Sequence, residues 1–337
     1  MFFSPSVSAL WKKLSAEVSS PFLAALLLCA GFWGFVAWDQ SHWWRVKADY
    51  SFGWLVPALV IFAIYDRWPR IVGAAARGAA EGSPRAAGWQ KWVLHLLVGI
   101  SLTLGAGFFL LGAFYRAGAG TSQPGTLAIT LGMIGLLLPL LLMNAPESPA
   151  PSSGSLVGDA RVKLAAWFLF PVLVWLVSAP MVSAVEQQVN LFLLRKVVMV
   201  VAFVFDLLGL PIEQQGNVLV LPTGSVGVED ACSGIRSLTA CLFAGSFLSA
   251  IFLEKLWKKI ALVGAAMGLA FLTNLGRSLF LTAWAYRHGP SAIEGVVHDV
   301  AGYAVLGLTV VGLLCLLPLL NLKISFGAGR VPPDATA

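Results

Sequence analysis

The sequence predicts an all-α polytopic membrane protein with about eight transmembrane helices. Of its 337 residues, 58% are hydrophobic and 11% are charged, whereas a soluble protein has about 25% charged residues. The mean hydropathy is +0.83, and long apolar stretches recur along the whole chain. These features exclude a soluble enzyme, a disordered chain and a nucleic-acid-binding domain, and they make the lipid bilayer the expected surrounding.

Eight apolar stretches predict spanning helices, because about 20 residues are needed to cross the hydrocarbon core. The first follows Lys12 and Lys13 and lacks a clear cleavage site, so we expect an uncleaved helix and not a signal peptide. A ninth apolar stretch, 197–209, is too short to cross and is predicted to be interfacial or re-entrant. The eight predicted spans cover 21–38, 52–66, 92–115, 125–143, 164–184, 231–252, 260–286 and 298–321.

Positive charge predicts the orientation of these spans. The net charge is +6, and most of the 22 Lys and Arg fall in segments that alternating crossings place on the side of the N-terminus. We expect the protein to lie in the inner membrane of the cell. The positive-inside rule then places both of its termini in the cytoplasm. Segments 73–88 and 145–159 are predicted to be flexible cytoplasmic loops, and 322–337 a cytoplasmic tail, of one integral membrane domain spanning 1–337.

The segment before the sixth span, 208–231, has a different pattern. Apolar residues alternate through NVLVL (217–221), and a Pro-Thr-Gly turn separates them from SVG (225–227). This pattern predicts a short β-hairpin on the extracytoplasmic face. The hairpin leads directly into a helix that is predicted to begin at Cys232.

Cys232 lies in VEDACSGIRS, where Asp230 is a plausible N-cap. In the first turn of a helix the dipole favours a thiolate, although the carboxylates of Glu229 and Asp230 oppose this effect. Cys232 is therefore either a nucleophile or a small buried apolar residue. The second interpretation is adopted for the other three cysteines, since the spacing of the four indicates neither a disulfide framework nor a zinc site. Those three are Cys29, Cys241 and Cys315.

Arg277 lies nine residues before Tyr286, the predicted outer end of its helix. At 1.5 Å per residue it is roughly 13 Å deep, which is too deep for easy snorkelling. It either faces a wet cavity or forms an ion pair with an acid on a neighbouring helix. Asn274, three residues earlier, is on the same helix face.

His298 opens the last predicted span, and Gly302 one turn later would allow another helix or a substrate to approach. It is either an interfacial polar residue or part of a site. The helices carrying Cys232, Arg277 and His298 are consecutive, and all three residues fall toward the outer side, so we expect them to be neighbours. Together they could support nucleophilic attack, with His298 taking the thiol proton and Arg277 stabilising the oxyanion.

The ordered set of motifs resembles the exosortase/archaeosortase family. It comprises VEDACSGIRSL, the Asn-x-x-Arg of TNLGR and the His of VVHDVAGY, and the resemblance extends over residues 43–321. Segment 43–68 is similar to an N-terminal segment of the family that is centred on the motif Tyr-Ser-His-Gly. Phe52 stands where that His would be, so this chain lacks whatever role the His has in relatives.

The resemblance implies a membrane cysteine protease that acts as a transpeptidase, with its active site at the extracytoplasmic face. Its partners would be membrane-anchored proteins with a C-terminal sorting signal, which consists of a short motif such as Pro-Glu-Pro, a membrane helix and a basic tail. By motif, Cys232 is the nucleophile, Arg277 the electrostatic stabiliser and His298 the general base and acid of a bacterial-type enzyme. Arg236, one turn after Cys232, and Asn274 have supporting roles. No metal or organic cofactor is implied.

Two other functions are compatible with some of these residues. A transporter or an assembly protein for polysaccharide export could use Arg236 and Arg277 to bind an anionic substrate. However, we find no inverted repeat, and the polar residues cluster in the last third of the chain. A metalloprotease is disfavoured because there is no His-Glu-x-x-His motif. The cognate substrate, the acceptor and the oligomeric state stay open.

Overall fold

A computed structural model describes residues 18–227 and 234–321 and confirms an all-α polytopic membrane fold. Eight helices in this part of the chain are long and apolar enough to cross a membrane, or nine if one bent pair is counted as a span. The long helices are α2 (Ser20–Val46), α3 (Val56–Ala79), α4 (Trp89–Ala119), α5 (Gln123–Met143), α9 (Ser183–Leu207), α11 (Gly234–Phe252), α12 (Leu256–His288) and α13 (Val296–Asn321).

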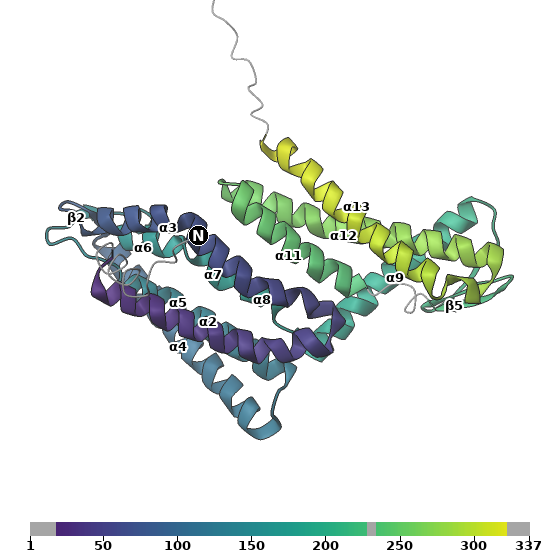
Figure 1. The fold of residues 1–337 in the computed structure, drawn as a ribbon, viewed down its shortest axis with the longest axis horizontal. Coiled ribbons are helices and arrows are strands. Elements are labelled where there is room, and N and C mark those ends of the chain that lie inside the picture. Colours follow the sequence, from purple (N-terminus) through teal and green to yellow (C-terminus); the bar gives the residue numbers. More distant parts are fainter. Residues whose placement is uncertain (1–17, 228–233, 322–337) are drawn as a thin grey trace, which may run out of the picture.

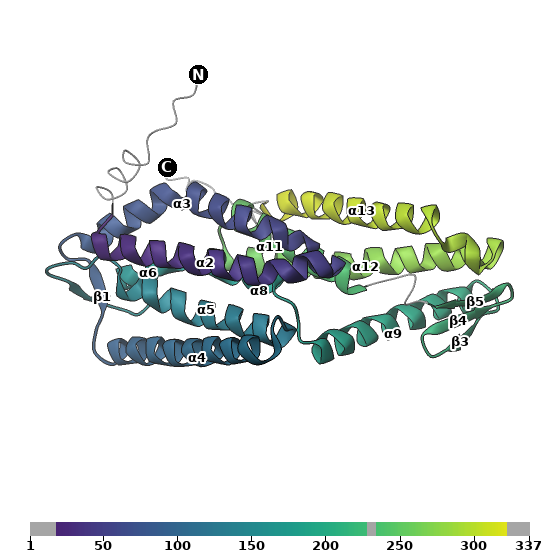
Figure 2. The ribbon, with the colours of Figure 1, turned by 60° about the horizontal axis from the view of Figure 1, so that its bottom comes forward.

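The molecule is elongated, with helices α2, α3, α4 and α5 gathered at one end (Figures 1 and 2). Helix α9 and a small sheet lie at the other end, and the long helix α12 runs toward them. Helix α11 packs against the 3-10 helix η1 (Ala48–Leu55) and against α12, so it joins the two ends. The second 3-10 helix, η2 (Pro290–Ile293), lies in the connection between α12 and α13.

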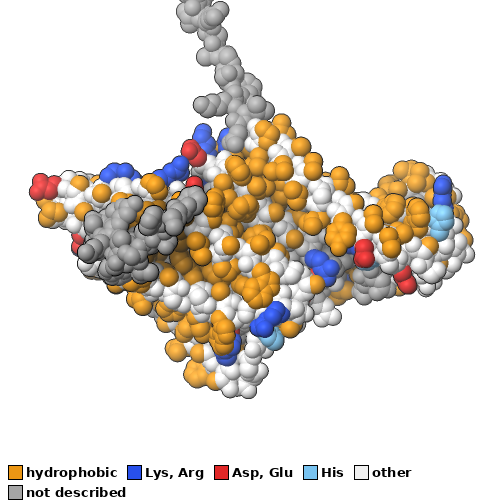
Figure 3. All heavy atoms as spheres, in the orientation of Figure 1, with side chains coloured by type: hydrophobic (Ala, Val, Ile, Leu, Met, Phe, Trp, Pro, Cys, Tyr) orange, Lys and Arg blue, Asp and Glu red, His pale blue; other side chains and the backbone are white. Residues whose placement is uncertain are grey.

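Small residues bring α4 and α5 close together. A Cβ atom on Gly105 would lie 2.6 Å from the carbonyl carbon of Gly135, and one on Gly132 would lie 2.5 Å from the backbone nitrogen of Phe109. In a bilayer, where apolar burial does not drive helix pairing, such contact of backbones is a main source of packing energy. The outer face of α4 carries exposed apolar side chains, among them Leu104 and Phe114. Hydrophobic side chains likewise form large patches on the face in Figure 3, as expected of a surface that meets lipid.

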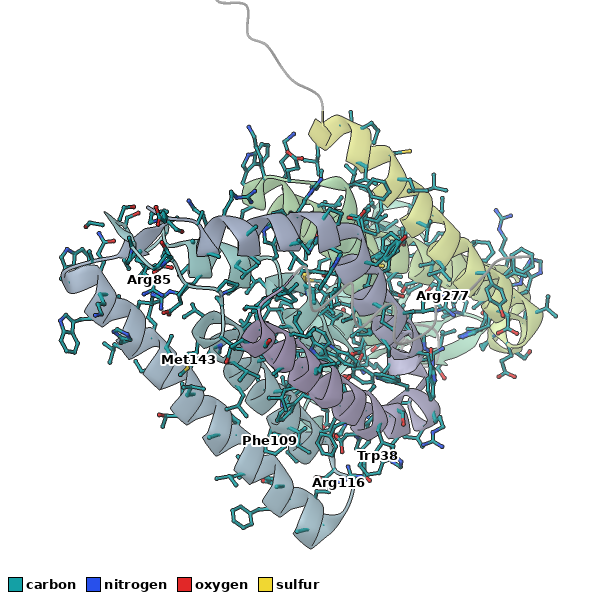
Figure 4. All side chains as sticks on the ribbon, turned by 60° about the vertical axis from the view of Figure 1, so that its left-hand side comes forward. Trp38, Arg85, Phe109, Arg116, Met143 and Arg277 are labelled. Carbon is teal, nitrogen blue, oxygen red and sulfur yellow. The ribbon has the colours of Figure 1, made fainter. Side chains whose placement is uncertain are left out.

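Several buried polar groups in the first half of the chain pair with one another. The amide of Gln40 donates to Thr130 Oγ1 at 2.9 Å and accepts from the hydroxyl of Ser178 at 2.8 Å. Asp39, which is buried, forms an ion pair with Arg116. The Arg116 guanidinium also lies 4.4 Å from the centre of the Trp38 ring, and Figure 4 shows the two side chains together. Pairing of this kind offsets the cost of burying charge.

The predicted span 164–184 is a broken helix. Its parts are α6 (Ala160–Ala166), α7 (Leu169–Leu173) and α8 (Trp175–Ser178), and the chain bends by 49° after α6. Pro171 explains the break, because it has no N–H to donate to the carbonyl four residues earlier and its ring crowds that carbonyl.

The treatment of 197–209 as a separate short stretch is wrong. These residues mostly form the C-terminal part of α9, a continuous helix of 25 residues that qualifies as a span by length and composition. The polar residues of its first half, including Glu186 and Arg195, hid the helix from a search for apolar runs. Figure 2 shows α9 beyond the ends of α2 and α4 instead of beside them, so an interfacial position for this helix stays a prediction.

The two segments predicted as separate flexible loops pair with each other. Strand β1 (Pro84–Ala86) aligns in parallel with β2 (Ser152–Gly154), and residues up to Ala79 belong to α3. The buried carboxylate of Asp159 accepts a hydrogen bond from the backbone N–H of Ala86 at 3.1 Å. A strand pair and a buried carboxylate therefore join the two loops, a contact that the sequence did not predict, and their flexibility stays a prediction.

The predicted hairpin is present. Strand β4 (Val218–Leu221) pairs antiparallel with β5 (Gly224–Gly227), and β3 (Glu213–Gln215) adds a third strand. Leu219 and Val226 are buried against α9 and α12. The hydroxyl of Thr223 donates to the carbonyl of Ala285 at 3.0 Å, which fixes the hairpin to the end of α12.

Candidate functional site

The Tyr-Ser-Phe-Gly segment forms η1 and packs against the start of α11. Tyr50 is buried, and its hydroxyl accepts a hydrogen bond from the backbone N–H of Met181 at 3.0 Å. The ring of Phe52 lies 5.2 Å from the ring of Phe243 on α11. Gly53 is required here, because a Cβ atom would collide with the indole of Trp44. Phe52, where this chain departs from the expected Tyr-Ser-His-Gly pattern, therefore makes an aromatic contact with α11.

Arg236 is held by this segment. Its Nε donates to Oδ1 of Asp49 at 3.1 Å, and the hydroxyl of Thr239 donates to the Asp49 carbonyl at 3.0 Å. Asp49 was not among the predicted site residues, although it directly precedes the Tyr-Ser-Phe-Gly segment. Asp49 and Arg236 are 187 positions apart, and a contact between residues so distant along the chain cannot be recognised from one sequence.

Arg277 and His298 meet, as predicted. Arg277 Nη2 lies 2.8 Å from His298 Nε2 and 3.4 Å from the His298 carbonyl oxygen. Because a guanidinium only donates, this contact is a hydrogen bond when Nε2 carries no hydrogen and accepts. Gly302 faces the same guanidinium, since a Cβ atom there would lie 3.7 Å from Arg277 Nη2. Figure 4 shows Arg277 beside α13, the helix that carries His298 and Gly302.

Two polar atoms beside this contact have no partner in the described part of the chain. They are Nε of Arg277 and Oδ1 of Asn274, and both are buried. Asn274 lies one turn before Arg277 and is 4% exposed. A buried donor and a buried acceptor without partners are costly, and a substrate peptide group carries the complementary pair. The ion pair with an acid that was considered for Arg277 is not formed with any described residue.

Cys232, Asp230 and Glu229 lie outside the described residues, so the position of the sulfur relative to His298 stays a prediction. Helix α11 is described from Gly234, two residues after Cys232. The other cysteines are free: Cys29 and Cys241 are buried, as apolar residues would be, and Cys315 is exposed on α13. Within 18–227 and 234–321 no group of three His, Cys, Asp or Glu residues could hold a metal ion.

A polar pocket of about 310 Å³ adjoins the start of α11. Lys47 crosses it to Glu186, with its Nζ 2.8 Å from Oε2. The pocket is bounded by the same Asp49 that holds Arg236 and by Ile235 of α11. It therefore offers a hydrogen-bonding recess next to the helix that follows Cys232. Its lining residues are Lys47, Asp49, Ser183, Glu186, Gln187, Asn190 and Ile235.

Comparison with known protein families finds a match over most of the chain. The model of a family described as transmembrane exosortase matches residues 43–315. This range includes η1, Cys232, Arg236, Asn274, Arg277 and His298. No curated protein and no solved structure matches the chain.

Proposed function

Because the chain belongs to the transmembrane exosortase family, we propose that it is a cysteine peptidase and transpeptidase that cleaves C-terminal sorting signals of membrane-anchored exported proteins. The observation that carries the proposal is the 2.8 Å contact between Arg277 and His298. It joins two of the three predicted catalytic residues across 21 positions of sequence, in the order that the family motifs require.

In the proposed first step, the thiol of Cys232 gives its proton to His298, and the thiolate attacks the carbonyl carbon of the scissile peptide. A neutral imidazole is the form that can accept this proton. For Nε2 to accept it, the Arg277 guanidinium must turn from Nε2 toward the developing oxyanion, where its charge stabilises the transition state.

Collapse of the tetrahedral intermediate breaks the C–N bond. His298 returns the proton to the leaving amine, which departs with the membrane helix and basic tail of the signal. The product is a thioester between Cys232 and the new carboxyl end of the substrate. An acceptor amine or water then attacks the thioester, and the thiol of Cys232 is restored. These steps need no group beyond the three side chains and the acceptor.

We place this site at the extracytoplasmic face of the inner membrane, with both termini cytoplasmic, because the Lys and Arg distribution favours that orientation. Enzyme and substrate helix would then share one bilayer, which confines them to two dimensions and raises their effective concentration.

The test is processing of a co-expressed protein that ends in a Pro-Glu-Pro motif, an apolar helix and a basic tail. We expect Cys232→Ala to be inserted at the normal level but to leave the substrate at full length. Cys315→Ala, which removes an exposed thiol on α13, is the matched control and should process normally. A hydroxylamine-sensitive adduct at Cys232 would identify the thioester. Full processing by Cys232→Ala would refute the assignment.

A further inference from the structure

A basic cavity lies far from Arg277 and His298, at the other end of α12. It has a volume of about 1040 Å³ and is lined by the C-terminal half of α3, by α6 and α7, and by the turn between α11 and α12. Lys259 of α12 lines it, and Arg277 follows eighteen residues later on the same helix, or roughly 27 Å away at 1.5 Å per residue. The cavity is therefore separate from the proposed catalytic site.

Cations outnumber carboxylates in the lining. Arg67, Arg70, Arg77, Lys163 and Lys259 line the cavity, together with Asp66 and Glu254. Figure 3 shows Lys and Arg side chains along the upper edge of this face, over α3. Like charges this close repel one another, so an anion in the cavity would lower the energy of the folded protein.

These five cations are left without carboxylate partners. Among the described residues none of them has a carboxylate oxygen within 4 Å. The nearby Arg161, in contrast, is paired with Asp159 at 3.0 Å.

Two of the cavity cations contact neutral groups instead. Buried Arg67 donates to the carbonyl of Ala250 at 2.7 Å, and its guanidinium lies 5.6 Å from the Phe170 ring centre. The Arg70 guanidinium lies 5.8 Å from the Trp167 ring centre. These contacts orient the two guanidinium groups without a direct carboxylate partner, and oriented guanidinium groups of this kind recognise phosphate.

The rim of the cavity is apolar. Leu169, Leu173, Phe252 and Leu256 line it, and each is more than a third exposed. A free phosphate ion would not use these side chains, whereas the acyl chains of a lipid would cover them. Basic pockets between transmembrane helices are suited to anionic lipid headgroups.

We propose that this cavity binds the phosphate of an anionic phospholipid, with the headgroup among the cations and the acyl chains along the apolar rim. The proposal does not depend on peptidase activity. Under the predicted orientation the lipid belongs to the cytoplasmic leaflet.

The experiment measures thermal unfolding of the full chain in an uncharged detergent. A short-chain phosphatidylglycerol should raise Tm by several degrees with saturation, because a ligand that binds only the folded state stabilises it. Phosphatidylcholine with the same acyl chains should produce little change. Equal shifts by the two lipids would refute headgroup recognition, and an equal shift by inorganic phosphate would refute the lipid as the source.

The variant is Arg70→Gln with Lys163→Gln, since both side chains are exposed in the cavity and their loss should not unfold the protein. We expect it to weaken phosphatidylglycerol binding at least tenfold. The matched control is Lys255→Gln with Lys258→Gln, which removes the same charge beside the cavity but outside its lining. The control should stay within about twofold of the original affinity. Equal losses in both would show nonspecific charge attraction and overturn the proposal.

Discussion

Nε of Arg236, at the start of α11, donates a hydrogen bond to Oδ1 of Asp49 in η1 at a distance of 3.1 Å. The Thr239 hydroxyl adds a second bond from α11 to the Asp49 backbone. These contacts tie the segment around Tyr50 to the helix that follows Cys232. Two distant parts of the family match therefore meet at one place, which gives the N-terminal motif a positioning role at the proposed site.

Asp49→Asn and Arg236→Gln should reduce processing more than stability. Arg236 is 58% exposed at its side chain, and an exposed pair of this kind contributes about 0.2–1 kcal/mol, so Tm should change little. If the pair positions the start of α11, the two single variants and the double variant should lose a similar fraction of the processing rate. Additive losses in the double variant would show that the two residues act independently.

Arg277→Lys and His298→Gln should each lower the processing rate, and Arg277→Lys should do so by about 100-fold, as expected for loss of an oxyanion donor. Both contacts with His298 are made by Nη2, and an ammonium lacks the further nitrogens that a guanidinium could turn toward the oxyanion. The measurement is the initial rate of substrate trimming at matched enzyme levels. Arg287→Lys, an exposed position at the end of α12, is the control. Wild-type rates in Arg277→Lys would rule out the stabilising role.

Gly53→Ala should destabilise the protein by about 1–3 kcal/mol, because the added Cβ collides with Trp44 in a packed region. The matched control is Gly34→Ala on α2, where a Cβ would have no neighbour within 4 Å. Removing a helical glycine there should be neutral or stabilising. The comparison of the two Tm values tests the packing of η1 separately from any activity. An unchanged Tm in Gly53→Ala would contradict the contact.

Acid should destabilise the region around β1 and β2. Burial raises the pKa of Asp159, but hydrogen bonds from Arg161 and from the Ala86 N–H outweigh it, and the pKa lies below its usual value. A hydrogen bond from Arg85 likewise lowers the pKa of Glu147. Because both folded-state values are depressed, their stabilisation is present above the unfolded pKa of about 4 and is lost as the pH falls through the folded pKa.

Asp159→Asn is the variant that tests this dependence. Its Tm should be lower than that of the original chain at pH 7 and should fall less steeply as the pH drops toward 3. The measurement is Tm against pH for the two proteins. Parallel curves would show that Asp159 contributes nothing to the acid sensitivity.

Composition and local pattern were sufficient for much of this architecture. The apolar stretches predicted most of the long helices, the alternation in 217–227 predicted the hairpin, and three motifs in order predicted that Arg277 and His298 would meet. The predictions were wrong where the ends of an apolar stretch do not coincide with the ends of a helix. Polar residues in the first half of α9 hid its length, and Pro171 broke a stretch whose apolar composition looked continuous.

What the sequence alone determined is the class of protein, since 58% hydrophobic residues in long runs cannot be accommodated in water. Which residues share a site depended on tertiary structure. Asp49 and Arg236, the pairing of β1 with β2, and the basic cavity all join side chains from distant segments. Such contacts arise from packing and charge between helices, and neither leaves a periodic signal along the chain.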